Sequence, residues 1–285
     1  MRLSICIPTH NRYPFLKWTV SRLKEIQGDI EIVISDNHSD DDTRCIQLQG
    51  VRYIEQYENI GAFPNLRAAL LAGQGEYVCY CGDDDYLLDD RLQEALDWMD
   101  AHPEVVAYFA PCELYDEVAQ APNWEAFYIA KDETFTEANT LWNFLIQNHV
   151  WPEHAIFRRS GLEAILQPRI RAYWAFVDLG HAFAQGPVHF ARKPYYRNIT
   201  NHPVGHRAKL GDQQCLTDFD EYRAGLENLA YELFKAHLSD GLKVKLRAMI
   251  NHFINVRLGV AHRLFTLQGR EAEAKSIEKR LAVCA

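Results

Sequence analysis

No run of about 18 apolar residues occurs in the 285-residue sequence, which therefore contains no candidate membrane-spanning helix. The segment after Met1 is too short for the apolar core of a signal peptide with its cleavage site. The seven cysteines are odd in number and include no Cys-x-x-Cys pair, which is typical of reduced thiols in the cytosol. These absences predict a cytoplasmic protein.

Excess positive charge is absent too. The formal net charge of −9 excludes a general nucleic-acid binder, which would present a basic face. The sequence contains neither Gly-x-Gly-x-x-Gly nor Gly-x-x-x-x-Gly-Lys, so neither a dinucleotide-binding fold nor a P-loop is supported. With 48% hydrophobic and 24% charged residues, the composition is that of an ordinary globular protein.

The first 110 residues alternate between short apolar runs and segments whose apolar residues recur at helical spacing. The runs predict buried strands at 3–7, 30–34, 51–54, 77–81 and 105–109. Such alternation predicts an α/β fold with a doubly wound, mostly parallel sheet and helices on both of its faces.

The later parts of the chain have a different pattern. After Pro111 the regularity is lost, whereas from about residue 211 apolar residues step by three and four, with a break at 239–241. This pattern predicts an antiparallel helix pair. We therefore divide the chain into 1–110, 111–210 and a helical extension, 211–285.

Polar segments follow three of the predicted strands, at 8–12, 35–39 and 82–85. Because open α/β sheets bind ligands at the carboxyl ends of their strands, these segments are expected to form one site. The third contains three adjacent carboxylates, which repel one another. A divalent cation shared with substrate phosphates would neutralise them. The alternative is a solvated turn that begins a helix.

Four motifs in order carry a resemblance to a known family. They are Ser-Ile-Cys-Ile-Pro-Thr-His-Asn-Arg at 4–12, Glu-Ile-Val-Ile-Ser-Asp-Asn-His-Ser at 31–39, Asn-Ile-Gly at 59–61 with Asn65, and Gly-Glu-Tyr at 75–77 leading to Asp83-Asp84-Asp85. Over about its first 110 residues the chain resembles family 2 glycosyltransferases of the GT-A fold. Asp36-Asn37-x-Ser39 in particular resembles members that build bacterial surface polysaccharides, such as O-antigen, capsule or exopolysaccharide.

The resemblance implies a metal-dependent, inverting glycosyltransferase. It would move a sugar from a nucleotide-diphosphate sugar to a hydroxyl of a glycan or lipid-linked acceptor, with Mn²⁺ or Mg²⁺ as cofactor. Asp36 would accept a hydrogen bond from a base N–H, which suits UDP-, dTDP- or GDP-linked donors and not cytidine. The implied nucleotide-sugar ligands are Pro8, Thr9, Asn11, Arg12, Asp36, Ser39, Asn65 and Asp83, and the implied metal ligands are Asp84 and Asp85.

The chain departs from the family pattern in two places. Gly82 stands where many members have the first acid of Asp-x-Asp-Asp. The family roles therefore fall on the acids at 83–85 without a unique assignment. Alignment by the following Tyr86-Leu87 favours Asp84 as the metal ligand. In the second half, Asp178 matches the position of a catalytic base, but Val177 replaces the acid that usually precedes it. Glu153 is the competing candidate for the base.

Two alternative functions remain from the sequence. A sugar nucleotidyltransferase also needs an acidic metal site, but the glycine-rich, basic N-terminal loop of such enzymes is missing. A non-catalytic nucleotide-sugar or glycan-binding module is the other alternative.

The segment 241–270 contains six Lys or Arg and no acid. This composition suggests peripheral contact with anionic lipid on the inner face of the cytoplasmic membrane, where a lipid-linked acceptor would lie. A homodimer seam and a simple lid on the core are the alternatives for the same segment.

Overall fold

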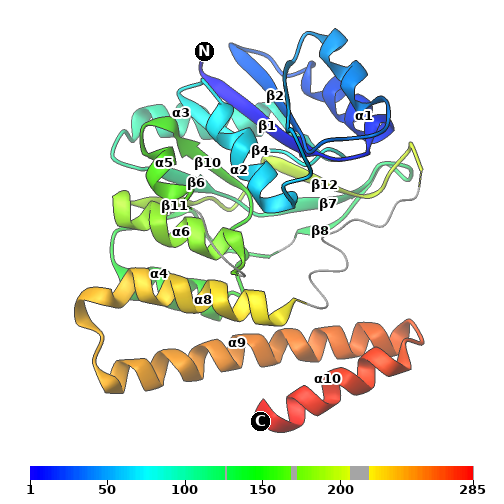
Figure 1. Ribbon diagram of the computed structural model, residues 1–285. Coiled ribbons are helices and arrows are strands. Elements are labelled where there is room, and N and C mark those ends of the chain that lie inside the picture. Colours follow the sequence, from blue (N-terminus) through cyan, green and yellow to red (C-terminus); the bar gives the residue numbers. More distant parts are fainter. Residues whose placement is uncertain (126, 168–171, 206–217, 285) are drawn as a thin grey trace. The chain divides into compact units, whose positions relative to one another are not determined.

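The structure is a computed structural model that describes residues 1–125, 127–167, 172–205 and 218–284 (Figure 1). The chain forms two compact units, each described here by itself. The first comprises Met1–Thr136, Trp151–Gln167 and His181–His206, and the second Glu137–Val150, Pro168–Gly180 and Arg207–Ala285. The boundaries at 110 and 210 drawn from the sequence stay predictions.

An eight-stranded mixed sheet forms the centre of the first unit. Its order is β3-β2-β1-β4-β10-β6-β11-β9. The first four strands are parallel, whereas β10 is antiparallel to both of its neighbours. Their bounds are β1 Leu3–Thr9, β2 Ile30–Asp36, β3 Arg52–Glu55, β4 Tyr77–Tyr80, β6 Ala107–Phe109, β9 Glu133–Phe135, β10 Ala155–Arg158 and β11 Val188–Phe190. The predicted α/β fold with its mostly parallel first half is confirmed.

Helices cover both faces of this sheet. Successive side chains of β1 point to opposite faces, and the helices on each face pack against one of the two sets. Leu3, Ile5 and Ile7 pack in one cluster with apolar residues of α1 (Tyr13–Leu23) and α3 (Asp89–Ala101). Helix α2 (Ala62–Ala72) contacts β1, β2 and β4, and the Gly73 that ends it lies against Ser4 on the opposite face of β1. A 3₁₀ segment, η1 (Asp42–Gln49), leads into β3.

A second, four-stranded sheet lies in the same unit and is absent from the sequence-based prediction. Its order is β5-β12-β7-β8, with bounds β5 Tyr86–Leu87, β12 Tyr196–Asn201, β7 Cys112–Asp116 and β8 Ala121–Glu125. The sequence predicts a loop at 192–197, and either a long loop or short edge strands at 112–135. The structure has short strands in 112–135, whereas the loop prediction is wrong at Tyr196 and Arg197, which belong to β12. No local pattern indicates the pairing of β5 with β12, because β5 has only two residues and β12 lies more than 100 residues away.

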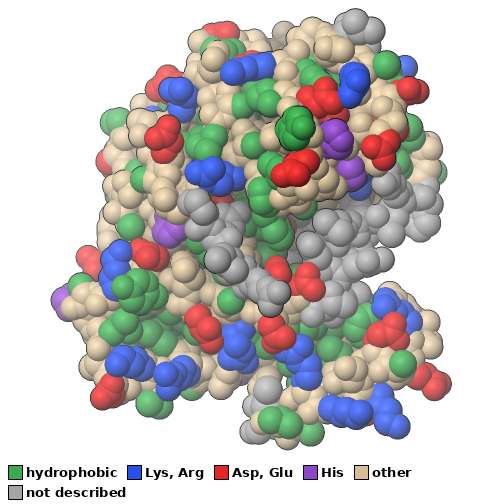
Figure 2. Space-filling view, viewed as in Figure 1, with side chains coloured by type: hydrophobic (Ala, Val, Ile, Leu, Met, Phe, Trp, Pro, Cys, Tyr) green, Lys and Arg blue, Asp and Glu red, His purple; other side chains and the backbone are tan. Residues whose placement is uncertain are grey.

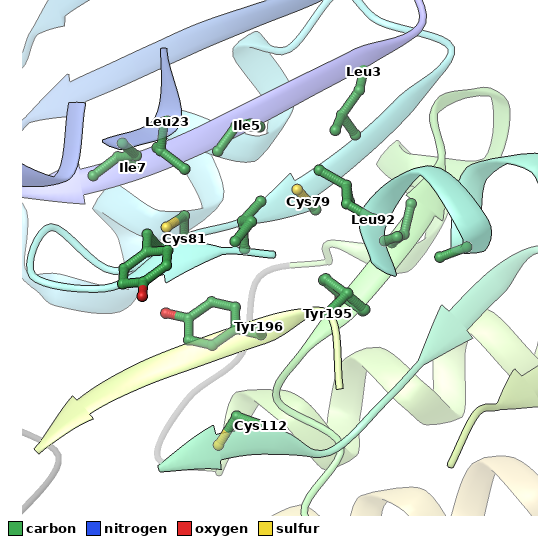
Figure 3. Packing of buried hydrophobic residues seen from close by; sticks show 14 of the residues in the cluster. Leu3, Ile5, Ile7, Leu23, Cys79, Cys81, Leu92, Cys112, Tyr195 and Tyr196 are labelled. Atoms are coloured by element: carbon green, nitrogen blue, oxygen red, sulfur yellow. The ribbon is translucent and has the colours of Figure 1, made fainter. Parts of the chain in front are cut away.

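A core cluster of buried apolar residues connects the two sheets. Figure 3 shows Leu3, Ile5 and Ile7 of β1 on one side, and Tyr195 and Tyr196 on the other, with cysteines between and beside them. Burial raises the pKa of the Cys79 thiol, so this sulfur acts as a small apolar side chain. The structure has free thiols at Cys6, Cys45, Cys79, Cys81 and Cys112.

The second unit is helical. It contains α4 (Ala138–Gln147) and the part of α6 (Trp174–Gln185) that ends at Gly180. The C-terminal helices α8 (Phe219–Phe234), α9 (Asp240–Leu267) and α10 (Glu271–Cys284) complete it. Helix α5 (Leu162–Ile165) belongs to the first unit. Ser239 caps α9, its hydroxyl accepting a hydrogen bond from Leu242 N at 3.2 Å. The predicted helix pair is confirmed as α8 and α9, and α10 packs on α9 as a third helix. No helix in the described part of the chain is long and apolar enough to cross a membrane.

Candidate active site

The three polar segments converge where β1, β2 and β4 end. Thr9 is aligned with Asp36 in the parallel pair of β1 and β2, and its carbonyl accepts a hydrogen bond from Asn37 N at 2.9 Å. On the other side, the Thr9 hydroxyl donates to Asp83 Oδ2 at 2.8 Å. Thr9 is thus the contact that joins all three segments, and Pro8 precedes it on β1, opposite Ser35.

Asp36 is 1% exposed and its carboxylate is largely occupied. Oδ1 accepts hydrogen bonds from the backbone N–H and the hydroxyl of Ser39, and Oδ2 accepts one from the Tyr53 hydroxyl at 2.5 Å. Burial, and then the hydrogen bond to Asp36, raise the pKa of Tyr53, so its hydroxyl stays a donor. A carboxylate has about four acceptor sites, and the described donors fill three of them. One site on Oδ2 is left for a single N–H donor.

Asn11 joins the first segment to the second. Its backbone N–H donates to the Ser39 hydroxyl at 2.8 Å, and its Oδ1 accepts from Asp40 N at 2.7 Å. Asn11 and His38 both have positive φ, 54° and 62°, a conformation that a short polar side chain such as Asn tolerates. Two tight turns therefore bring Asn11 and Ser39 together beside Asp36.

Asn65, on α2, is buried beneath these turns. Its amide donates to Ser35 O at 2.8 Å and to Thr9 O at 3.4 Å, and its Oδ1 accepts from the Ser35 hydroxyl at 2.7 Å. Asn65 therefore holds the ends of β1 and β2 together. A nucleotide contact of this side chain stays a prediction.

The three acids at 83–85 have different surroundings. Asp85 accepts hydrogen bonds from the Tyr196 hydroxyl at 2.8 Å, Asn198 Nδ2 at 3.2 Å and Ile199 N at 2.8 Å, so both of its oxygens are bound to β12. Gly82 N donates to the same Tyr196 hydroxyl at 2.8 Å. A Cβ on Gly82 would lie 2.8 Å from Asp85 Oδ2 and 3.2 Å from the Tyr196 hydroxyl, so a side chain at this position would crowd the contact of Asp85 with β12.

Asp83 and Asp84 are paired with Arg12. Arg12 Nε lies 3.1 Å from Asp83 Oδ1, and Arg12 Nη2 donates to Asp84 Oδ2. The guanidinium carbon lies 5.0 Å from the centre of the Phe15 ring. Burial alone would lower the pKa of Arg12, but Asp83 and Asp84 outweigh it and raise the pKa. The positive charge of Arg12 thus offsets part of the repulsion between Asp83 and Asp84, so this repulsion by itself does not require a metal.

The residues nonetheless fit a divalent cation. No set of three metal-ligating side chains gathers within the described residues. Mg²⁺, however, is commonly held by one or two carboxylates together with substrate phosphates. Asp83 and Asp84 offer such a pair, whereas Asp85 is held by β12. The predicted metal pair of Asp84 and Asp85 stays a prediction, and these contacts favour Asp83 over Asp85 as the second ligand.

The two base candidates lie in different units. Glu153 belongs to the first unit; its side chain is 35% exposed and its Oε2 lies 4.0 Å from His154 Nε2. The His154 ring stacks on Tyr196 at 3.8 Å between centroids, and Tyr196 in turn holds Asp85. Asp178 is buried on α6 in the second unit. The predicted base role of each residue stays a prediction.

Three contacts of the site were missed from the sequence. Tyr53 holds Asp36, and Tyr196 and Asn198 hold Asp85. Tyr53 lies on the predicted strand that follows the strand of Asp36 in the sequence. Parallel pairing of these two strands is a signal from which the contact could have been found. Nothing local marks Tyr196, because its partner lies 111 residues away.

Comparison with known proteins identifies the family. The sequence model described as "Glycosyl transferase family 2" matches residues 4–166, more than half of the chain. The chain belongs to this family. The resemblance inferred from the four motifs is therefore confirmed.

Individual relatives agree with this assignment. The chain is 26% identical over 174 residues to a GalNAc(5)-diNAcBac-PP-undecaprenol beta-1,3-glucosyltransferase of Campylobacter jejuni, which covers 57% of this chain and 53% of that protein. Its fold is similar to that of S. aureus TarS 1-349 in complex with UDP-GlcNAc, with a TM-score of 0.65, 16% identity, and coverage of 97% and 79%. It is also similar to the mannosyltransferase PcManGT from Pyrobaculum calidifontis in complex with GDP-Man and Mn²⁺, with a TM-score of 0.56, 15% identity, and coverage of 99% and 84%.

The matches to curated relatives are partial. They span between about a third and about a half of those proteins' own lengths: 34%, 39% and 53%. At under 20% identity, the two solved structures establish the fold alone.

Proposed function

We propose that this protein transfers a sugar from a nucleotide-diphosphate sugar to a hydroxyl of a glycan or lipid-linked acceptor, with inversion at the anomeric carbon. The observation that carries this proposal is the convergence on Thr9 of the Asp36 turn and the Asp83–Asp84 pair. Such an arrangement provides a carboxylate for a nucleobase at one end, and at the other a carboxylate pair that would hold a divalent cation shared with a diphosphate. Membership of glycosyl transferase family 2 supports the same reading.

The proposed roles follow from the contacts. Asp36, positioned by Ser39 and Tyr53, accepts one N–H from uracil, thymine or guanine through its remaining acceptor site. Pro8, Thr9, Asn11 and Asn65 shape the floor of the nucleotide pocket. Asp83 and Asp84 hold Mn²⁺ or Mg²⁺. That the related fold of PcManGT was solved with GDP-Man and Mn²⁺ supports the metal assignment.

The chemistry is an in-line displacement. A divalent cation held by Asp83 and Asp84 would neutralise the charge that develops on the departing nucleotide diphosphate. The acceptor hydroxyl attacks the anomeric carbon from the opposite side, and a carboxylate of this chain takes the hydroxyl proton as the bond forms. Asp178 is the proposed base and Glu153 the competing candidate.

The direct test is a set of UDP-, dTDP-, GDP- and CDP-sugars incubated with the protein, Mn²⁺ and a lipid-linked sugar acceptor. We expect release of the nucleoside diphosphate together with an elongated acceptor for at least one donor. In a parallel incubation with added pyrophosphate and no acceptor, formation of a nucleoside triphosphate and a sugar 1-phosphate would instead identify a sugar nucleotidyltransferase. Nucleotide-sugar binding without turnover across a wide set of acceptors would favour a non-catalytic module.

Base recognition leads to the first quantitative prediction. Asp36→Ala is expected to weaken binding of the preferred nucleoside diphosphate about tenfold or more, because an unpaired buried N–H costs about 1–3 kcal/mol. Isothermal titration calorimetry measures the change, and circular dichroism checks that the variant is folded. Tyr53→Phe is the matched control: it removes a donor to Asp36 and leaves the carboxylate, so a smaller loss is expected. Equal affinity of the unaltered protein for cytidine and uridine nucleotides would contradict the assignment.

The acceptor side gives a second prediction, which concerns α9. Lys243, Lys245 and Arg247 lie exposed in its first turns around Val244, whose side chain is 65% exposed. We propose that this segment contacts anionic lipid, since each Lys or Arg near such a surface contributes about 1 kcal/mol. Figure 2 also shows Asp and Glu among the Lys and Arg side chains of the C-terminal helices, so the contact should be weak and salt-dependent.

Co-sedimentation with vesicles containing phosphatidylglycerol tests this contact. Replacing Lys243, Lys245 and Arg247 by Gln is expected to reduce binding strongly, whereas replacing Lys275 and Lys279 of α10 is the control. If vesicle binding changes neither with salt concentration nor with replacement of these three residues, the proposed lipid contact is rejected. A homodimer seam and a simple lid on the core would then remain for this segment, and the molar mass in solution distinguishes them.

A further inference from the structure

The position of Arg12 suggests a property of the acidic pair that the proposed function does not include. Its guanidinium contacts the two carboxylates proposed as metal ligands, through Nε for Asp83 and through Nη2 for Asp84. All three side chains are at most 14% exposed. Arg12 Nε is buried and lies at ion-pair distance from Asp83, but it makes no hydrogen bond with any described residue. The contact of Nε with Asp83 is therefore electrostatic, whereas Nη2 donates a hydrogen bond to Asp84.

A divalent cation needs the same oxygens. Mg²⁺ and Mn²⁺ bind carboxylate oxygens directly, and the guanidinium on Asp84 Oδ2 already occupies one of the acceptor sites that they would use. A metal placed beside the seated guanidinium would also face its positive charge at short range in a largely buried site. Arg12 and the metal therefore compete for Asp83 and Asp84.

We infer that Arg12 is a built-in competitor of the divalent cation, one that yields the acidic pair only when a diphosphate offers it other oxygens. This inference rests on the proposed function for the identity of the diphosphate. Arginine suits the exchange, because its planar fork of donors matches phosphate as well as carboxylate. The pair with Arg12 carries one net negative charge; a divalent cation and a doubly negative diphosphate together leave that charge unchanged.

The consequence is a coupling between two ligands. In the unaltered protein, the metal alone must displace Arg12 from the acidic pair and leaves it without a partner. When a nucleoside diphosphate binds with the metal, its oxygens pair with Arg12 instead. Each ligand therefore raises the affinity of the other by the same factor. Removing the guanidinium should strengthen binding of the metal alone and weaken its dependence on nucleotide.

The test is the affinity for Mn²⁺, measured by electron paramagnetic resonance of the free ion, with and without UDP. Arg12→Gln is expected to bind Mn²⁺ alone about tenfold or more tightly than the unaltered protein, since a competing buried charge is removed. UDP should then improve Mn²⁺ affinity less in the variant than in the unaltered protein. Adding Asp84→Asn to Arg12→Gln should abolish the gain, which places the ion at the acidic pair.

Arg2 supplies a matched control. Its Nη2 lies 2.6 Å from both Asp97 and Asp100, so Arg2→Gln also removes a guanidinium from two carboxylates of the same unit. No gain in Mn²⁺ affinity is expected there. If Arg12→Gln does not fold, Arg12→Lys serves instead: a compact ammonium cannot span both acids, so a smaller gain is expected.

The outcomes separate this inference from the proposed function. Equal Mn²⁺ affinity of Arg12→Gln and the unaltered protein overturns the competition, even if sugar transfer with Mn²⁺ is observed. A tenfold gain in the Mn²⁺ affinity of Arg12→Gln, together with no sugar transfer by the unaltered protein, supports the competition and rejects the transferase proposal. No Mn²⁺ binding to either protein, with or without UDP, overturns both the competition and the metal role.

Discussion

Asp84→Asn is expected to lower the rate of sugar transfer by at least about a hundredfold, the usual effect of losing one group that stabilises developing charge. Asn keeps the shape of Asp84 but removes the negative charge that holds both Arg12 and a divalent cation. The dependence of nucleotide binding on Mn²⁺ should disappear in the same variant. The rate of nucleoside diphosphate release and calorimetric titration with UDP, with and without Mn²⁺, measure the two effects.

Asp85→Asn is the matched control, because it makes the same change one residue along. Asp85 accepts three hydrogen bonds from β12, two of them at 2.8 Å. An amide nitrogen in place of one oxygen would face a donor, which should lower the free energy of unfolding by about 1–3 kcal/mol. We therefore expect Asp85→Asn to be less stable to heat while keeping turnover at temperatures where it is folded, and Asp84→Asn to lose turnover even where it is folded. Full activity of Asp84→Asn in excess chelator would rule out the metal role.

The half of the fold that carries the site was predictable from the sequence for a physical reason. The strands β1, β2 and β4 are short, apolar and separated by helical segments, so the local pattern predicts that they are strands and that they run parallel. Once the strands are parallel, their following segments must meet at one edge. Thr9, Asp36 and Asp83 accordingly lie together in the structure as the pattern predicts.

Long-range pairing sets the limit of such prediction. Strand β5 has two residues, and no local pattern reveals that β12 pairs with it. The partners of Asp85 were missed for the same reason, so its carboxylate was grouped with that of Asp84 although the two have different surroundings. Arg12 shows a further limit, since the sequence offers several cations and only the folded chain selects the one that reaches the acids.

The catalytic base should give the other large effect. Asp178→Asn is expected to lower kcat about a hundredfold or more, since general base catalysis contributes typically about 10²–10⁴-fold. An acceptor hydroxyl is a very weak acid, and its proton must leave as the bond to the anomeric carbon forms. Donor affinity should not change, because Asp178 is proposed to face the acceptor only. Single-turnover rates and calorimetric titration with the donor separate the two quantities.

The acids of the first three segments are poor alternatives for this role. Ser39 and Tyr53 hold Asp36, β12 holds Asp85, and Arg12 pairs with the remaining two. The base must therefore come from elsewhere, and Glu153 is the candidate in the unit that contains the acidic segment. Its 35% exposed side chain beside His154 is open to an acceptor, whereas Asp178 is 2% exposed.

Glu153→Gln is consequently the decisive companion variant. If Asp178 is the base, Asp178→Asn loses kcat at every pH at which the unaltered protein is active, while Glu153→Gln changes mainly the KM for the acceptor. If Asp178 only stabilises α6, Asp178→Asn should lower the melting temperature and leave kcat intact. Normal turnover of Asp178→Asn together with an inactive Glu153→Gln would move the base to Glu153, because only a group that takes the acceptor proton is expected to affect kcat without affecting donor binding.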